Sequence, residues 1–147
     1  MSYSIIIPIY NEFRTLKKLL KELKHYHILG HEIIIVDDGS NDRSVHLLKN
    51  SFINLIRLKK NSGKGIAIRK GLIYSKNDKV IIYDGDLELE TKDISKFFYL
   101  DREKRKFSIM GYRFKNLNPT KSSDEWGNFI FTVFFNFLFK SCHKDIL

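Results

Sequence analysis

Short apolar runs alternate with amphipathic segments along this chain. Runs of this kind are typical of strands buried on both faces of a parallel sheet. They lie at residues 4–8, 32–37, 54–58 and 79–84, with a weaker run at 107–111. Helical periodicity predicts helices at about 12–26, through Leu47 and Leu48, at about 61–74, near 93–100 and at about 125–142. The alternation predicts a doubly wound α/β domain with a mainly parallel central sheet.

Composition narrows the class of protein without naming a function. The chain has 147 residues and a formal net charge of +9, which suits a single domain over 1–147 with a real core. The positive charges are scattered, and the lysines of the first predicted helix alternate with its leucine stripe as on a solvated face. A nucleic-acid-binding α/β domain is an alternative that rests on charge alone. Since the sequence has no continuous basic stripe or nucleic-acid-binding motif, we expect no nucleic-acid partner.

Cysteine usage and the apolar runs bear on the compartment. Cys142 is the only cysteine, which excludes an intramolecular disulfide and fits a reducing compartment. No signal peptide is evident at the N-terminus, and the longest apolar run, 129–139, is too short to span a bilayer. These features predict a cytoplasmic protein.

Two acids follow the fourth predicted strand. Asp84 and Asp86 are two residues apart, so in an extended chain both carboxylates point the same way. Such a pair repels itself unless a cation lies between, and oxygen ligands suit Mg²⁺ or Mn²⁺. Gly85 leaves room for a close approach, and Glu88 lies on the same side if the chain stays extended. The alternative is that these are loop carboxylates that cap the next helix.

Polar residues also follow the first two predicted strands, where doubly wound sheets bind their ligands. After the first strand, we expect Pro8 and Asn11 to shape a turn, and Tyr10 offers a ring that can stack on a base. Glu12 can accept a hydrogen bond from a ribose hydroxyl, or it can be an acid that favours the start of the helix. After the second, an acid at 37–38 is placed either to accept hydrogen bonds from a ligand or to form a turn with Gly39. Both uses remain open.

Four motifs in this order resemble those of family 2 glycosyltransferases, and most closely those of the polyprenyl-phosphate sugar synthases of the dolichyl-phosphate mannose synthase type. They are residues 4–12 (SIIIPIYNE), 32–42 (EIIIVDDGSND), 61–65 (NSGKG) and 84–88 (DGDLE). The resemblance implies a Rossmann-like, glycosyltransferase A-type domain. It also implies inverting transfer of a hexose from a GDP- or UDP-linked sugar to an acceptor, for which polyprenyl phosphate is expected.

The resemblance also assigns roles to individual residues. The nucleoside pocket would be lined by Pro8, Tyr10, Glu12, Val36 and Asp38. Asp84 and Asp86 would hold Mg²⁺ or Mn²⁺ and the donor diphosphate, with a backbone contact from Gly85. Glu88 stands where many relatives have Gln and would be a further ligand on the metal side.

Catalysis would then involve Asp86 and Arg113. Arg113 matches a basic position that faces the donor in the family. The alternative is that Arg113 is an exposed arginine without that role. The segment 63–65 (GKG) lacks the spacing of a P-loop, so its glycines are expected to ease the start of a helix, and no catalytic role is assigned to Lys64.

The resemblance divides the chain into a nucleotide-sugar-binding part, 1–113, and the start of an acceptor-side region, 114–147. The domain is expected to be truncated on the acceptor side, so a partner would supply the missing region. Alternatives are a catalytically impaired nucleotide-sugar-binding remnant and a transferase acting on a glycan hydroxyl. The aromatic run 129–139 suits either a core or a wall facing lipid. Together with the positive charge, the second option would place the protein at the cytoplasmic face of an anionic membrane.

Overall fold

The computed structural model describes a four-stranded unit and part of a second unit. The described residues are 2–49, 52–98, 130, 132–134 and 136–137. The chain divides into Met1–Glu103 and Lys104–Leu147. In the second unit, the described residues are helical, as the predicted helix at 125–142 requires. The predicted strand at 107–111 and Arg113 lie outside the described residues. No helix within the described part is long and apolar enough to cross a membrane.

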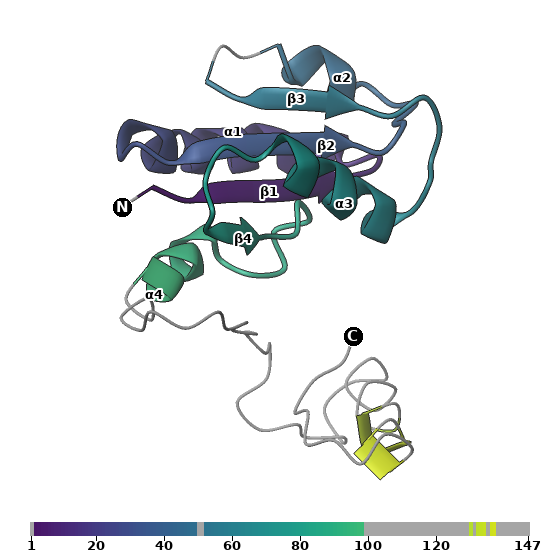
Figure 1. Ribbon diagram of the computed structural model, residues 1–147. Helices are drawn as coiled ribbons and strands as arrows, with labels where there is room; N and C mark the ends of the chain where they lie inside the picture. The colour runs from purple at the N-terminus through teal and green to yellow at the C-terminus, as the bar shows by residue number, and fades with distance from the viewer. Residues whose placement is uncertain (1, 50–51, 99–129, 131, 135, 138–147) are drawn as a thin grey trace. The chain divides into compact units, whose positions relative to one another are not determined.

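The first unit is built on a parallel sheet, as the apolar runs predict. Its strands are β1 (Ser4–Ile9), β2 (Glu32–Asp37), β3 (Asn54–Arg57) and β4 (Val80–Ile82), in the spatial order β3-β2-β1-β4. All three pairings are parallel. The order reverses at β1, where crevices for ligands form in open α/β sheets. Figure 1 shows β1 between β2 and β4.

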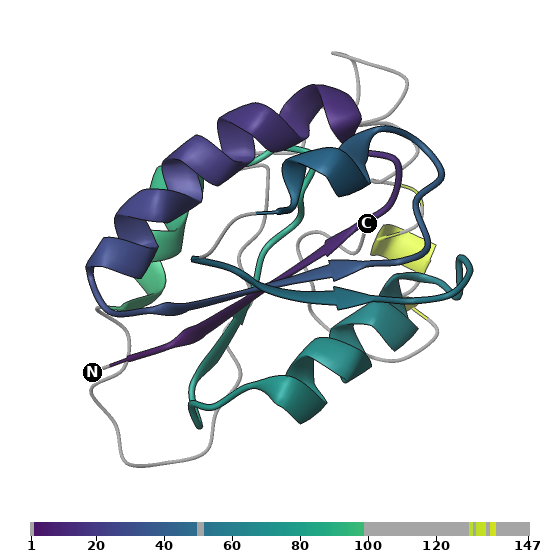
Figure 2. The same ribbon diagram turned by 90° about the horizontal axis from the view of Figure 1, so that it is seen from above.

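Helices cover both faces of this sheet. They are α1 (Phe13–Ile28), α2 (Ser44–Leu47), α3 (Lys64–Tyr74) and α4 (Ile94–Phe98), with a 3₁₀ turn, η1 (Thr91–Asp93), before α4. Figure 2 shows α1 and α4 on one face and α3 on the other. The predicted boundaries agree closely, except that β4 is shorter than the apolar run at 79–84 because the chain leaves the sheet at Tyr83.

The strands β1 and β2 send alternate side chains to two separate cores. The larger core joins β1 and β2 to the leucines of α1, all of which are buried on one stripe: Leu16, Leu19, Leu20 and Leu23. The smaller core faces α3 and contains Ile6, Ile34, Val36 and Ala67. Burying a leucine or isoleucine side chain contributes about 1.5–3 kcal/mol. The sheet is therefore held mainly from the α1 side.

Pro8 lies inside β1 and pairs with Val36, which corrects the expectation that it shapes a turn. A proline in a central strand usually costs a ladder hydrogen bond. Here Ile6 accepts a backbone hydrogen bond from the β4 side, whereas Ile9 accepts one from Asp38 on the β2 side. By this alternation the backbone of Pro8 faces the β4 side. Since β4 ends at Ile82, level with Ile6, no ladder bond is lost at Pro8.

Candidate functional site

A pocket of about 200 Å³ opens where β1, β2 and β4 end. It is lined by Pro8, Ile9, Tyr10, Glu12, Asp38, Lys64, Ala67, Asp84, Gly85 and Asp86. The structure therefore brings together seven of the eight residues that the sequence assigns to donor binding. Val36 is the exception, since its side chain is fully buried in the core beneath α3 and does not line the pocket.

The segment after β1 is fastened to the loop after β2. Asn11 has a positive φ of 56°, and its backbone N–H donates to the Ser40 hydroxyl at 2.9 Å. Its side-chain oxygen accepts from the backbone N–H of Asn41 at 3.0 Å. Tyr10, next to it, is 41% exposed, so its ring is available to a ligand. Glu12 accepts a hydrogen bond from the Thr15 hydroxyl and keeps further acceptor positions open.

Asp42 links the same two loops from the other side. Its carboxylate accepts from the backbone N–H of Phe13, at the start of α1, and from that of Ser44, at the start of α2. Burial raises the pKa of Asp42, but the hydrogen bonds from Ser44 and Phe13 outweigh it and lower the pKa below its usual value. The carboxylate is thus ionised near neutral pH and accepts the first backbone N–H of both helices, although the N-cap positions themselves are Glu12 and Arg43.

The two acids at the end of β2 have separate structural partners. Asp37 is fully buried; one of its oxygens accepts from Ser40 N–H at 2.9 Å, and the other lies 3.2 Å from Arg57 Nε. Asp38 accepts from the backbone N–H groups of Ser62 at 2.8 Å and Gly63 at 2.7 Å. Asp37 therefore forms the turn, and Asp38 is the one that lines the pocket.

Gly39 makes this loop fit against the segment before α3. Its φ is +74°, and a Cβ at this position would lie 2.5 Å from the carbonyl carbon of Lys60. Only a residue without a side chain can combine that backbone conformation with that approach. The expected role of Gly39 in supplying a positive φ is confirmed, and the close contact with Lys60 is an additional reason for glycine.

The acids after β4 lie on a turn, whereas the sequence-based argument assumed an extended chain. The chain turns at Gly85 and Asp86, and Leu87 has a positive φ of 62°. Asp84 and Asp86 still line the same pocket, but Glu88 is exposed and does not. Asp86 instead accepts from Glu88 N–H at 3.0 Å. Because of the turn, Glu88 does not lie on the same side as Asp84 and Asp86, as it would in an extended chain.

Gly85 brings this turn against the end of β1. A Cβ on Gly85 would lie 2.6 Å from the side chain of Ile9, and the Gly85 carbonyl oxygen lies 3.3 Å from the Thr15 hydroxyl. The expected close approach at Gly85 is thus made by the protein's own strand.

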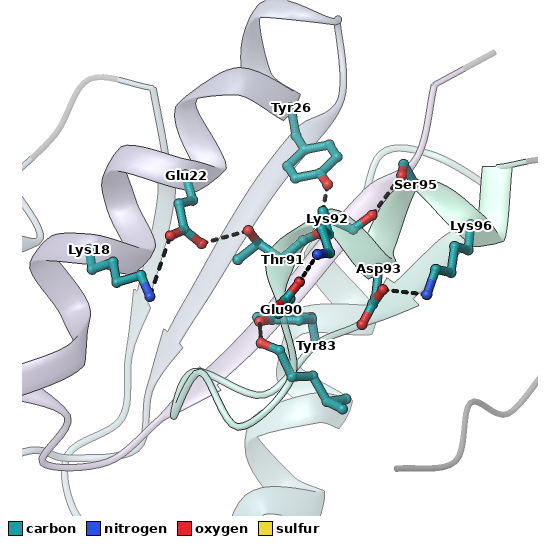
Figure 3. Close-up of polar contacts among 11 residues, drawn as sticks. Lys18, Glu22, Tyr26, Tyr83, Glu90, Thr91, Lys92, Asp93, Ser95 and Lys96 are labelled. Carbon is teal, nitrogen blue, oxygen red and sulfur yellow. Dashed lines mark hydrogen bonds and ion pairs between the residues drawn. The ribbon is translucent and has the colours of Figure 1, made fainter. Parts of the chain in front are cut away.

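The far end of the turn is anchored to α1, as Figure 3 shows. Tyr83 donates its hydroxyl to the Leu89 carbonyl, which closes the segment that carries both acids. Tyr26 of α1 donates to the Thr91 carbonyl at 2.6 Å, and the Thr91 hydroxyl donates to Glu22 at 2.6 Å. Burial raises the pKa of Tyr83 to about 12, so this hydroxyl stays protonated and remains a donor.

Lys64 is a residue of this pocket that the sequence analysis did not select. Its ammonium nitrogen lies 2.7 Å from Asp84 Oδ1 and 2.8 Å from Asp84 Oδ2. Residues 63–65 were compared only with the P-loop pattern, and that pattern gave no reason to select Lys64. The signal that would have found it is its position after the third strand, at the same sheet edge as the acids.

The donor atoms at this edge suit a divalent cation. Asp84 and Asp86 offer carboxylate oxygens to one pocket, and the ammonium on Asp84 shows that this position attracts a positive charge. Mg²⁺ commonly takes one or two protein carboxylates and completes its shell with water and phosphate. No group of three or more His, Cys, Asp or Glu side chains suited to a metal occurs among residues 2–49 and 52–98 or the described part of the second unit. A role for Glu88 as a ligand stays a prediction.

The chain is similar in sequence to proteins of known name. Over 117 residues the chain is 34% identical to an undecaprenyl-phosphate 4-deoxy-4-formamido-L-arabinose transferase of Pseudomonas aeruginosa, covering 74% of this chain and 34% of that protein. Over 112 residues it is 34% identical to a dolichyl-phosphate beta-glucosyltransferase of Dictyostelium discoideum, covering 63% and 33%. The chain thus spans about a third of the length of these relatives.

Solved structures share the fold. The S. aureus protein TarS, in complex with UDP-GlcNAc, matches with a TM-score of 0.55 at 26% identity, over 68% of this chain and 32% of that one. The mannosyltransferase PcManGT from Pyrobaculum calidifontis, in complex with GDP-Man and Mn²⁺, matches with a TM-score of 0.52 at 22% identity, over 57% and 27%. The fold is thus the glycosyltransferase A type that the resemblance implied. Residues 4–144 match the profile of "Glycosyl transferase family 2", and the chain belongs to that family.

Proposed function

We propose that this chain binds a GDP- or UDP-linked sugar and transfers its hexose to polyprenyl phosphate with inversion at the anomeric carbon. One observation carries the proposal: a single pocket gathers an exposed aromatic ring and carboxylates from three strand ends. Membership of the family supports the class of donor. The two relatives, which are named for undecaprenyl-phosphate and dolichyl-phosphate, support the class of acceptor.

The nucleoside lies on the β1 and β2 side of the pocket in this proposal. Tyr10 stacks on the base, since its ring is exposed beside the pocket. Glu12 accepts from a ribose hydroxyl through positions that Thr15 leaves open. Asp38 uses two of its roughly four acceptor positions on Ser62 and Gly63, so a ligand N–H or O–H can take another.

The diphosphate lies on the β4 side. Asp84 and Asp86 would hold Mg²⁺ or Mn²⁺ there, and the bound ion would neutralise charge on the departing diphosphate. The chain's own part is to fix these acids: Tyr83 closes their segment, and Gly85 seats it against Ile9. By the resemblance, Arg113 would stabilise the same leaving group.

In this proposal the acceptor attacks the anomeric carbon of the donor sugar. A lipid phosphate is already anionic and attacks without a strong general base, whereas a hydroxyl acceptor needs one. The aromatic run at 129–139 and the net positive charge suit contact with an anionic membrane surface. Liposome sedimentation tests this contact; equal failure to bind neutral and anionic vesicles would remove it.

A titration of donors tests the pocket directly. Isothermal titration of GDP- and UDP-sugars, with and without Mn²⁺, is expected to show one donor whose affinity requires the ion. Asp86→Ala should weaken that affinity about tenfold to hundredfold, as expected for loss of a contact to a charged group. The matched control is Asp78→Ala, which removes an exposed acid at the opposite end of the strands and should leave affinity unchanged. Absence of any donor binding would contradict the proposal.

Transfer is tested separately, with labelled donor and undecaprenyl phosphate in mixed micelles. Label in the lipid fraction supports the acceptor class. Donor binding without transfer or hydrolysis would identify a nucleotide-sugar-binding module instead. Label on a glycan acceptor alone would correct the acceptor to a hydroxyl.

A further inference from the structure

Among the described residues, Lys64 makes the closest polar contact of the Asp84 carboxylate. One ammonium group reaches both oxygens, at 2.7 and 2.8 Å, although the two side chains remain 59% and 42% exposed. Both residues line the donor pocket. The ammonium therefore occupies the side of Asp84 on which a divalent cation would bind.

The backbone places Lys64 there through Asp38. Asp38 fixes the N–H groups of Ser62 and Gly63, and Gly63 has a φ of +94° that directs the chain into α3 with Lys64 as its first residue. A positive charge at the N-terminus of a helix opposes the helix dipole, and the first turn of α3 contains no acid. Lys64 thus does not stabilise its own helix; its favourable partner is Asp84.

We infer that Lys64 is the resident cation of the donor pocket, which neutralises Asp84 until a nucleoside diphosphate arrives and then transfers to the diphosphate oxygens. The inference rests on the proposed function, because it assumes a donor that docks beside Asp84 and Asp86. In the donor-free chain Lys64 competes with the divalent cation for Asp84. Once the diphosphate is present, its additional negative charge accommodates both cations.

This arrangement couples the two ligands. Because the donor draws Lys64 away from Asp84, it raises the affinity for the metal, and by linkage the metal raises the affinity for the donor by the same factor. A chain without the ammonium binds the metal readily in the absence of donor and gains less from it when donor is added.

The test measures Mn²⁺ binding by electron paramagnetic resonance, with and without GDP or UDP, on the full chain. For Lys64→Met we expect about two- to fivefold tighter Mn²⁺ binding without nucleotide, the effect of removing a partly exposed ion pair. We also expect about tenfold weaker nucleotide binding, from the lost charged contact. Lys64→Arg should keep the coupling in the wild-type direction. Lys70→Met, an exposed lysine of the same helix, is the control and should change neither affinity.

Two negative results are distinguishable. If the wild-type chain binds neither Mn²⁺ nor nucleotide, the proposed function fails. If the wild-type chain binds both and Lys64→Met binds both with unchanged affinity, the inference about Lys64 is overturned while the proposed function stands. Circular dichroism of each variant confirms that the fold is retained.

Discussion

Two acidic pairs follow strands of the same sheet, and they are used differently. Asp37 and Asp38 are buried at the end of β2, and their oxygens contact Arg57 and backbone N–H groups of the protein itself. Asp84 is half-buried and Asp86 is exposed after β4, and among the described residues their partners are Lys64 and one backbone N–H. The first pair organises the loops beside the pocket, and only Asp38 of that pair lines it, whereas both acids of the second pair line it.

The difference shows that an acid at a strand end is not by itself a ligand. Burial and the number of backbone donors around it decide the role. A carboxylate surrounded by N–H groups organises the loops, and one left to a flexible side chain can exchange its partner for a ligand. Four experiments test this contrast, beginning with the largest expected effect.

Replacing Gly39 should be the most damaging change in the first loop. Gly39→Ala combines a left-handed backbone with a clash against Lys60, and we expect a loss of about 3 kcal/mol in the free energy of unfolding. Gly30→Ala is the matched control, since Gly30 has a φ of +88° but nothing within 4 Å of its Cβ position. It should cost only about 1 kcal/mol. Equal losses in urea titrations would show that the contact with Lys60 is unimportant.

Removing one acid from each pair should separate stability from binding. Asp38→Ala leaves two backbone N–H groups without their acceptor, so we expect a loss of about 2–3 kcal/mol in the free energy of unfolding. Asp84→Ala removes only a partly exposed ion pair and should cost less than about 1 kcal/mol, while Mn²⁺ and donor binding are lost. Chemical denaturation and calorimetry measure the two effects. A stability loss of the same size in both variants would erase the distinction drawn here.

Removing the Tyr83 hydroxyl should loosen the segment that carries the second pair. Tyr83→Phe deletes the hydrogen bond to the Leu89 carbonyl, with an expected cost of about 1 kcal/mol. Donor affinity should fall more in this variant than in Tyr26→Phe, whose lost bond to Thr91 lies farther along the chain from the acids. Paired calorimetric titrations of the two variants check this, and an equal fall in both would mean that Tyr83 does not position the acids.

The smallest expected effect is a pH dependence from the same hydroxyl. Burial raises the pKa of Tyr83 from 10.0 to about 12 in the folded chain. Because the folded state holds this proton more tightly, the stabilisation is complete below about pH 10 and is lost as pH rises through about 12. Above pH 10 the free energy of unfolding should therefore decline more steeply with pH in the wild type than in Tyr83→Phe. Part of the slope should remain in the variant, since burial also raises the pKa of Tyr26.

The apolar runs predicted the sheet and most helix boundaries because strands buried on both faces leave an unmistakable pattern. The apolar run 4–8 correctly included Pro8 in the first strand, but the turn expected at Pro8 was wrong, since β1 continues to Ile9. A proline is accommodated there because of where β4 ends, which is a property of the register. The prediction that the chain stays extended from Asp84 to Glu88 was also wrong, because Leu87 adopts a positive φ, which leucine rarely does.

The residues of the candidate site were harder to assign than the fold. Motif order selected Tyr10, Glu12 and both acids after β4, and the structure brings them to one pocket. The resemblance also selected Asp38, which lines the pocket. Residue chemistry alone left the uses of Asp37 and Asp38 open, because the donors that distinguish them come from distant positions, Arg57 and the backbone before α3. The motifs also missed Lys64, because its partner, Asp84, is twenty residues further along the chain.

The order of strands in the sheet has a consequence for how the protein is made. β1 leaves the ribosome first, yet β4, its neighbour on the acidic side, is translated only after β2, β3 and α3. In the proposed function, a nascent chain that ends before β4 contains the loops for the nucleoside but none of the acids after β4 for the diphosphate. Capture of a nucleotide sugar on the ribosome would therefore report the moment at which the last of these strands has docked.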